Sequence, residues 1–353
     1  MPVTTPDDFF THQLITTHDH VLYNDISWAE RAFFTVGVPG GFVLDTGLSF
    51  YPNNDVLEAY VVVAVDDKQY NIRASRSLKA GRWNKDVGPF EFVTVDPLKV
   101  WEIHLRENKI GITLDLRYVS RAAPIECRSP FLRKQGRLMY DNVNFFQSGR
   151  YFGTVSVRGQ TFNVDGQAGH RDRTWGVRNS GEGTVPRGLL TWVSAEFSDH
   201  SIMAIIYERA NGKHAHAAGA ISYEDGRVLD IEEFEHDLSF EPGSKRFVRG
   251  EYKFTDETGK VWRIEAERES TLYLSGAGYT SNELRRGLQR GKYWEWTELW
   301  DQKNPSQYPE YDGLMDNLSR FRCEGRDGHG IVETLLGEHH RYLPRATAPE
   351  ERS

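Results

Sequence analysis

The sequence predicts an all-β protein, and two observations support that fold class. Apolar and polar residues alternate with period two along most readable segments, including Trp101–Leu105, Ile112–Tyr118 and Trp262–Ala266. Such alternation is typical of antiparallel strands with one buried and one exposed face. Aromatic residues make up 12% of the chain, which favours strands and cavities lined by rings. Helix signals are sparse, the clearest being short turns over Thr5–His12 and Asn282–Gln289.

Turn residues separate these short strands, as at Arg158-Gly159 and Asp225-Gly226, and this spacing indicates sandwiches or barrels. A chain of 353 residues exceeds the usual size of one hydrophobic core, so we expect two domains. We place their boundary near Asp165, which gives domains of residues 1–165 and 166–353. Neither half alternates strands with helices, and no glycine-rich phosphate loop follows a strand. These features exclude a parallel dinucleotide-binding sheet.

Charge and hydropathy narrow the class of partner. A net charge of −8 argues against a nucleic-acid-binding surface, because phosphate neutralisation needs a basic face. No apolar run approaches the roughly 20 residues of a membrane helix. The segment Met1–Thr11 lacks the basic and apolar regions of a signal peptide, so we predict a cytoplasmic location. The sequence is compatible with a homodimer.

Cysteine and histidine spacing gives no sign of a cofactor. Cys127 and Cys323 lie far apart, and we expect free thiols rather than a disulfide. No CxxC or HExxH motif is present. His214 and His216 alternate on one strand face, but no third ligand is in register with them. We therefore predict no metal site and no organic cofactor.

The segment Gly166–Arg178 concentrates the residues that could carry chemistry. Asp172 is the strongest candidate acid, because an aromatic cavity would raise its pKa by desolvation. The arginines around it, Arg171, Arg173 and Arg178, favour the carboxylate instead, so an ion-pair cluster that pins two domains together is an equal alternative. His170 is a candidate proton relay.

Aromatic and acidic residues elsewhere extend the candidate site. Trp175 is either a pocket wall that stabilises positive charge or part of the core. In the predicted strand Leu189–Glu196, Thr191, Val193 and Ala195 face one way, and Trp192, Ser194 and Glu196 face the other. Glu196 is therefore a second candidate acid or base, unless its face is exposed to solvent. The remaining predicted contacts with substrate are Arg173, Arg178, Tyr293, Trp294 and Trp296.

Two further features leave alternatives open. The rings of Tyr293, Trp294, Trp296 and Trp300 fit either a pocket for an apolar ligand or packing between domains. Glu333, in a predicted last strand, either points inward to balance an arginine or is exposed. No Gly-x-Ser-x-Gly elbow marks a nucleophilic serine.

The stretch His170–Arg178 resembles the Arg-Asp-(His)-Ser-Trp-Gly-x-Arg signature of double lipocalin-like proteins, a group that includes AttH-type proteins, carotenoid 1,2-hydratase and tocopherol-cyclase-like members. Gly47–Asn53, Pro97–Trp101 and Gly153–Gly166 agree with that resemblance. It implies two lipocalin-like antiparallel barrels packed together, with the motif at the start of the second.

The resemblance also implies enzymes such as hydratases and cyclases that act on apolar terpenoid- or polyketide-like molecules. In hydratase members a histidine and a tryptophan of the motif are implicated, with an aromatic residue and an aspartate on the following strand. The tryptophan corresponds to Trp175 and the aromatic residue to Trp192. Arg173 stands where the histidine is expected, and the aspartate position falls near Ala195 or Glu196.

Together these features predict a cofactor-independent lyase or isomerase that acts by acid–base chemistry on a hydrophobic small molecule. The acid would be Asp172 or Glu196, and His170 or the other carboxylate would serve as the base. The alternative is a non-catalytic, lipocalin-like carrier of an apolar metabolite, in which the Arg–Asp cluster is purely structural.

Overall fold

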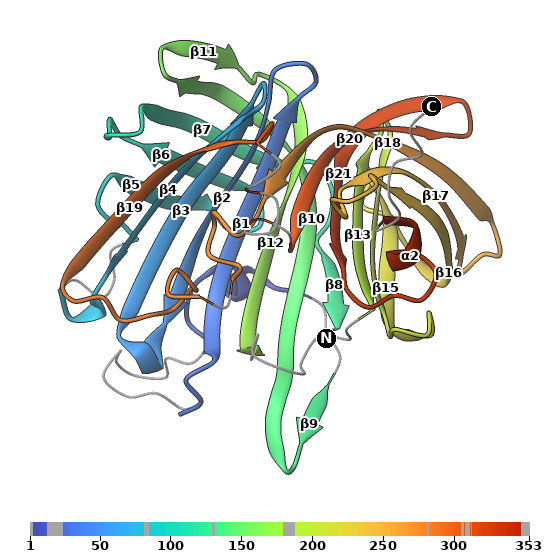
Figure 1. Cartoon of the computed structure of the whole chain (residues 1–353), viewed down its shortest axis with the longest axis horizontal. Helices are drawn as coiled ribbons and strands as arrows, with labels where there is room; N and C mark the ends of the chain where they lie inside the picture. Colours follow the sequence, from blue (N-terminus) through green and yellow to red (C-terminus); the bar gives the residue numbers. More distant parts are fainter. Residues whose placement is uncertain are drawn as a thin grey trace.

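Antiparallel strands build both halves of the protein, as a computed structural model shows for residues 3–12, 24–80, 85–128, 131–178, 188–280, 282–304, 307, 311 and 313–346. One half is a curled sheet of thirteen strands, and the other is a closed barrel of eight. The two lie side by side, with β10 and β12 of the sheet between them in Figure 1. The predicted all-β class is confirmed.

The curled sheet has a main path of ten strands in the order β19-β4-β3-β2-β1-β12-β10-β7-β6-β5, and β8, β9 and β11 pair with β10 beside that path. Among the described strands its ends, β19 and β5, do not pair with each other, so this half is curled but open. Its strands are β1 (Trp28–Val38), β2 (Phe42–Tyr51), β3 (Val56–Val65), β4 (Lys68–Arg76), β5 (Phe90–Asp96), β6 (Val100–Leu105), β7 (Ile112–Ser120), β8 (Ile125–Arg128), β9 (Leu132–Lys134), β10 (Arg137–Val157), β11 (Gln160–Asn163), β12 (Gln167–Arg178) and β19 (Tyr293–Asp301).

The barrel closes in the order β13-β14-β15-β16-β17-β18-β20-β21. Its strands are β13 (Leu189–Glu196), β14 (His200–Glu208), β15 (His214–Tyr223), β16 (Val228–Phe240), β17 (Phe247–Asp256), β18 (Val261–Tyr273), β20 (Met315–Cys323) and β21 (Arg326–Leu336). The only helical elements among the described residues are short: η1 (Thr5–Asp8), η2 (Pro52–Asn54), η3 (Leu78–Ala80) and α2 (Leu343–Ala346). None of these helices is long and apolar enough to cross a membrane. The helical turns expected over 282–289 are ordinary turns instead.

The chain passes from the curled sheet to the barrel after the predicted boundary at Asp165. β12 follows that residue but pairs with β1 and β10 of the curled sheet, so the barrel begins only at β13. β19 comes from the second half of the chain and pairs with β4 of the curled sheet. The motif therefore lies within the curled sheet instead of opening the barrel. A division into independent domains 1–165 and 166–353 stays a prediction.

Three apolar clusters result from this arrangement. The inner core lies on one face of the curled sheet and includes Phe34, Trp101 and Tyr118. The barrel core fills the barrel and includes Val193 and Trp262. The interface core joins the other face of the curled sheet to the outer wall of the barrel, and it includes Phe33, Tyr60, Phe146, Trp192 and Leu318.

Burial on both faces explains the strands that do not alternate. All ten residues of β2 and all ten of β3 are buried, because one face meets the inner core and the other meets the interface core. A strand covered on both sides reads as a nearly continuous apolar run, as Val61-Val62-Val63 does. β18, by contrast, alternates buried and exposed residues over its first half. Both cysteines are free and buried, as expected.

A buried ion pair fastens the N-terminal segment to the curled sheet. Arg171 Nη1 lies 2.5 Å from Asp8 Oδ1, and both side chains are fully buried. Gln147 Oε1 accepts from Arg171 Nε at 3.0 Å and from Nη2 at 2.8 Å. Asp8 Oδ2 also accepts from the Trp101 indole at 2.9 Å and from the Leu98 amide at 2.6 Å. Burial opposes ionisation of Asp8, but Arg171 and these donors hold its pKa below the usual range.

Arg171→Ala is expected to lower the free energy of unfolding by about 3–5 kcal/mol, because it leaves the Asp8 carboxylate buried without its cation. Urea unfolding followed by tryptophan fluorescence measures this change. Arg117→Ala is the control, since it removes an ion pair to Glu102 whose side chains are 51% and 33% exposed, and it should cost less than about 1 kcal/mol. Equal losses in the two variants would contradict the structural role of Arg171.

Candidate functional site

The alternation of β12 divides the predicted motif between two faces of the curled sheet. Arg171, Arg173 and Trp175 point towards the inner core, whereas His170 and Asp172 point towards the barrel. Glycine is required at Gly176, where φ is +125° and a Cβ atom would lie 2.4 Å from the Asp141 carbonyl oxygen. The thirteen-residue motif therefore supplies two separate groups of side chains.

Arg173 and Trp175 belong to a structural clasp around the N-terminal segment. Arg173 is fully buried and donates to the carbonyl oxygens of Arg31 at 2.6 Å and Phe9 at 2.8 Å. Its Nη2 also lies 3.3 Å from Glu30 Oε2. The Trp175 ring stacks on His12 with centroids 3.8 Å apart. These contacts place both predicted substrate-binding residues away from the face that carries Asp172.

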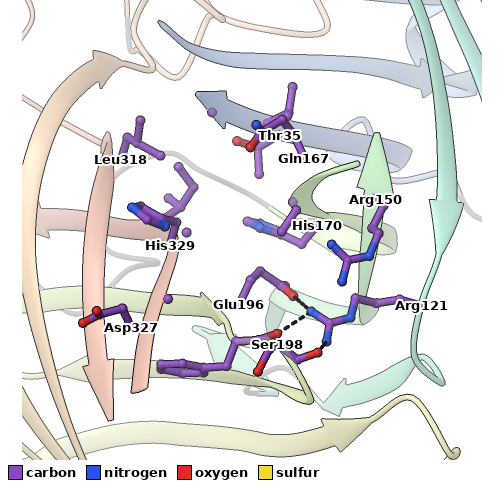
Figure 2. A pocket seen from close by; sticks show the side chains of 18 residues that line it. Thr35, Arg121, Arg150, Gln167, His170, Glu196, Ser198, Leu318, Asp327 and His329 are labelled. Atoms are coloured by element: carbon purple, nitrogen blue, oxygen red, sulfur yellow. Dashed lines mark hydrogen bonds and ion pairs between the residues drawn. The ribbon is translucent and has the colours of Figure 1, made fainter. Parts of the chain in front are cut away.

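His170 and Glu196, two of the three predicted catalytic residues, line the same pocket. This junction pocket has a volume of about 200 Å³ and lies between β1 and β12 of the curled sheet and β13, β20 and β21 of the barrel. Figure 2 shows the His170 ring and the Glu196 side chain on its walls. The lining residues are Thr35, Val36, Gly37, Arg121, Arg150, Gln167, Ala168, Gly169, His170, Glu196, Phe197, Ser198, Leu318, Asp327, Gly328, His329, Gly330 and Ile331.

Glu196 has one oxygen held and one oxygen without a hydrogen-bond partner. Ser148 Oγ donates to Oε2, and Arg121 Nη1 lies 3.3 Å from the same atom. Among the described residues, Oε1 is buried and accepts no hydrogen bond. Burial raises the pKa of Glu196 to about 7, even though Ser148 and Arg121 favour the carboxylate. A substantial share of Glu196 is therefore a neutral acid near pH 7.

His170 is a neutral imidazole in this site. Burial lowers its pKa to about 3, so it does not hold a second proton at physiological pH. The proton-relay argument from its ordinary pKa therefore fails, although a neutral ring still offers one donor and one acceptor. The ring lies edge-on to Trp192 at 5.0 Å between centroids and 5.8 Å from Phe33. Its Nε2 has no partner among the described residues.

Asp172 and Arg178 are half-buried and do not line the junction pocket. Burial raises the pKa of Asp172 to about 6, against the opposing charges of Arg178, Arg173 and Arg31. Arg178 lies near the ring of Tyr279, at 6.0 Å from its centroid. Burial thus favours the protonated acid and the arginines favour the carboxylate, so both predicted alternatives for Asp172 apply.

Three further carboxyl groups meet in this interface. Asp45 of β2 contacts Asp316 of β20, which pairs across the strands with Glu333 of β21. Thr35 also interacts with Asp45, and the contact between the two carboxyl groups of Asp45 and Asp316 requires a proton on one of them. Burial raises the pKa of Asp45 to about 6, that of Glu333 to about 8, and that of Asp316 well above its usual range. The Glu333 side chain is buried and interacts with the charge of Arg178. This is the first of its two predicted alternatives, in which it points inward to balance an arginine.

The predicted aromatic cluster lies on β19, at the edge of the curled sheet, and none of it lines the junction pocket. Tyr293 is 48% exposed. The Trp294 ring lies 4.2 Å from the Arg290 guanidinium carbon. Trp296 packs on a small cluster that contains Trp300 and Tyr311. These contacts fit the packing alternative.

The residues that sequence reasoning missed are Arg121, Ser148, Asp45 and Asp316. Arg121 and Ser148 carry no local signal, because they reach Glu196 only through the packing of the sheet against the barrel. Asp45 does carry a signal, since it interrupts the apolar segment Phe42–Leu48 at a position that a strand buried on both faces would fill with an apolar residue.

A larger groove of about 680 Å³ lies on the barrel between β16, β17, β18, β20 and β21. Charged side chains dominate its lining, including Arg249, Glu251, Glu265 and Glu267. It contains none of the predicted site residues, and its charged walls do not suit an apolar substrate.

Solved structures share this fold. A Nitrosomonas europaea protein named for AttH matches with a TM-score of 0.55 and 13% identity, over 93% of this chain and 98% of the other. CghA, in a crystal structure with Sch210972, matches with a TM-score of 0.50 and 10% identity, over 89% of this chain and 90% of its own. Kievitone hydratase from Nectria haematococca covers 93% of this chain and 94% of its own at 10% identity, but its TM-score of 0.42 is too low to argue from. The resemblance to AttH-type double lipocalin-like proteins is thus confirmed at the level of fold.

No curated protein matches the sequence. The profile of DUF8625, described as a family of unknown function, matches residues 3–342. The chain therefore belongs to this family of unknown function.

Proposed function

We propose that this protein is an enzyme of the hydratase, dehydratase or cyclase type, which uses Glu196 as a general acid on a hydrophobic small molecule without an organic cofactor. The observation that carries the proposal is the Glu196 carboxyl group in the junction pocket, with one oxygen held by Ser148 and Arg121 and the other without a partner among the residues that the structure describes. A carboxyl group with a pKa near the working pH is suited to proton transfer.

The proposed reaction begins with transfer of the Glu196 proton to an alkene carbon or to a hydroxyl leaving group. Ser148 and Arg121 then stabilise the new carboxylate through Oε2. In a hydration, water adds to the cation and returns a proton to Glu196. In an isomerisation or dehydration, the carbon next to the cation loses a proton to Glu196 instead. Either route restores the neutral acid and balances the protons.

The lining of the pocket combines the charged side chains of Arg121, Arg150 and Asp327 with apolar walls, and the apolar walls suit such a substrate. Val36, Phe197, Leu318 and Ile331 provide apolar walls. His170, neutral and without a partner at Nε2, is proposed to orient a substrate hydroxyl group or the attacking water. This role replaces the predicted role of His170 as a base, because an imidazole with a pKa of about 3 is a weak base. Trp192 backs the His170 ring, whereas Trp175 and Arg173 take no part in the reaction.

Asp172 is proposed as a supporting group rather than the reacting acid. It lies on the same face of β12 as His170, but outside the junction pocket. Together with Asp45, Asp316 and Glu333 it makes the interface rich in carboxyl groups whose pKa burial raises. These four groups do not line the junction pocket.

Glu196→Gln is expected to lower turnover by about 10²- to 10⁴-fold, because glutamine cannot supply the proton. For the wild type, kcat/KM should fall as pH rises through about 7, since only the protonated carboxyl group acts. The substrate is sought by incubating the protein with an organic extract of cell metabolites and following by mass spectrometry a gain or loss of water, or isomerisation at constant mass.

Glu224→Gln is the matched control. Glu224 also contacts Arg121, at 3.0 Å, but its side chain is 51% exposed and lies outside the pocket, so turnover should be unchanged. Full turnover by a folded Glu196→Gln variant would refute the role of Glu196. If the wild type bound one extract component stoichiometrically and returned it unaltered, the carrier alternative would replace the enzyme.

Glu333→Gln is expected to weaken the pH dependence of stability. The pKa of Glu333 rises from the usual 4.5 to about 8 in the folded protein, so between these values the folded state holds a proton that the unfolded state has lost. Its contribution to the free energy of unfolding therefore falls as pH rises through that range. Urea unfolding at several pH values measures the slope, with exposed Glu267→Gln as the control. An unchanged slope in Glu333→Gln would contradict the protonated state of Glu333.

A further inference from the structure

Three histidines surround one glutamate at an end of the barrel, in residues that the junction pocket does not use. Glu208 ends β14, His214 begins β15, and His236 lies within β16. His339 comes from the segment just before α2, which lies beside β15 and β16 in Figure 1. Histidines from three parts of the chain thus converge on a single carboxylate.

A shift of strand register creates this cluster. The pairing of β14 with β15 slips between Tyr207 and Glu208, so that Glu208 lies opposite His214 while Tyr207 lies opposite His216. His214 therefore meets a carboxylate that simple alternation would not place beside it. The sequence predicted no metal site because His214 and His216 had no third ligand in register, and the structure supplies Glu208 and His236 from neighbouring strands.

The distances in the cluster match those between ligands of one small cation. Glu208 Oε1 lies 3.2 Å from His214 Nε2 and 3.2 Å from His236 Nε2. The three ligand atoms all lie within 4.8 Å of one another. Bonds of about 2.0–2.2 Å to a tetrahedral zinc ion place two ligands about 3.3 Å apart. These contacts therefore leave room for an ion at bonding distance from all three atoms.

The hydrogen bonds of His236 direct a lone pair into the cluster. Tyr342 Oη lies 2.9 Å from His236 Nδ1, donates to the His236 carbonyl oxygen at 3.3 Å and accepts from the Leu238 amide at 3.3 Å. With its own proton used on that carbonyl, the hydroxyl accepts from Nδ1–H, so the neutral ring has its lone pair on Nε2.

That lone pair faces Glu208 Oε1, which is also an acceptor. Both side chains are almost fully buried, 4% exposed for His236 and 6% for Glu208. Two acceptors buried at 3.2 Å repel each other, so a proton or a metal cation must lie between them.

The surrounding side chains hold the ligands in place. His339 Nε2 lies 2.8 Å from Glu208 Oε2, the carboxylate oxygen that the two other histidines do not contact, and its side chain is 2% exposed. Partners of this kind orient the ligands of most metal sites, as Tyr342 does for His236. The His214 side chain is 39% exposed, which leaves the cluster open to solvent on one side.

We propose that Glu208, His214 and His236 bind a divalent transition-metal ion of the zinc class, with His339 and Tyr342 as supporting partners. Two imidazoles and one carboxylate are a ligand set that zinc accepts with a fourth position left for water. The ion would tie β14, β15 and β16 to the C-terminal segment. The proposal is independent of the reaction at Glu196.

Isothermal titration of the full chain with zinc chloride, after treatment with a chelator, tests the site. We expect one zinc ion per chain and a higher melting temperature with zinc. His214→Ala should weaken binding at least about tenfold, and His339→Ala should weaken it by about 10- to 100-fold. His214 is half-exposed, so its variant should fold even where a change at buried His236 does not.

His104→Ala is the matched control, because His104 Nδ1 lies 3.1 Å from Asp115 Oδ1 in the curled sheet, and no third ligand lies beside the pair in the described part of the chain. Its zinc affinity should equal that of the wild type. The proposal is overturned if the wild type binds no zinc, or if His214→Ala and Glu208→Gln both bind it with unchanged affinity. If zinc bound without raising the melting temperature, the proposal that the ion links β14, β15 and β16 to the C-terminal segment would be wrong.

Discussion

Burial of β12 on both faces is the constraint on which the rest of the structure depends. Arg171 and Arg173 are fully buried in this strand, so they must find their partners within the protein. Arg171 and Arg173 are satisfied by Asp8, Gln147, Glu30 and carbonyl oxygens of the N-terminal segment. On the opposite face, His170 and Asp172 remain neutral or partly protonated in an apolar interface.

The same constraint places the candidate site outside the barrel lumen. Apolar side chains such as Val193, Ile206 and Phe321 fill the barrel, together with Trp262. The junction pocket lies instead between the outer wall of the barrel and the curled sheet, where Glu196 of β13 approaches Ser148 of β10. Two β units that each have a filled core can thus share a site that neither would form alone.

Local pattern predicted some of this arrangement. The alternation in Leu189–Glu196 assigned Trp192, Ser194 and Glu196 to one face, and the structure confirms that face as the one towards the curled sheet. The sequence pattern was not used to place Arg173 and Trp175 on the opposite face of the strand from Asp172, because the crowded motif was interpreted as a single cluster. The pattern also left the ring cluster of β19 open between a pocket and packing, and its contacts in the structure are those of packing on an edge strand.

The sequence by itself determined the all-β class, the positions of most strands and the parity of side chains along them, because period-two burial is a local property of the chain. Only the tertiary structure decided which face meets which surface and which strands share a sheet. It also paired Glu196 with Ser148 and Arg121, and Glu208 with three histidines. Most of these contacts join residues far apart in sequence, and a single register shift between β14 and β15 places His214 opposite Glu208. Pairing across strands depends on register and packing, which alternation within one strand does not specify.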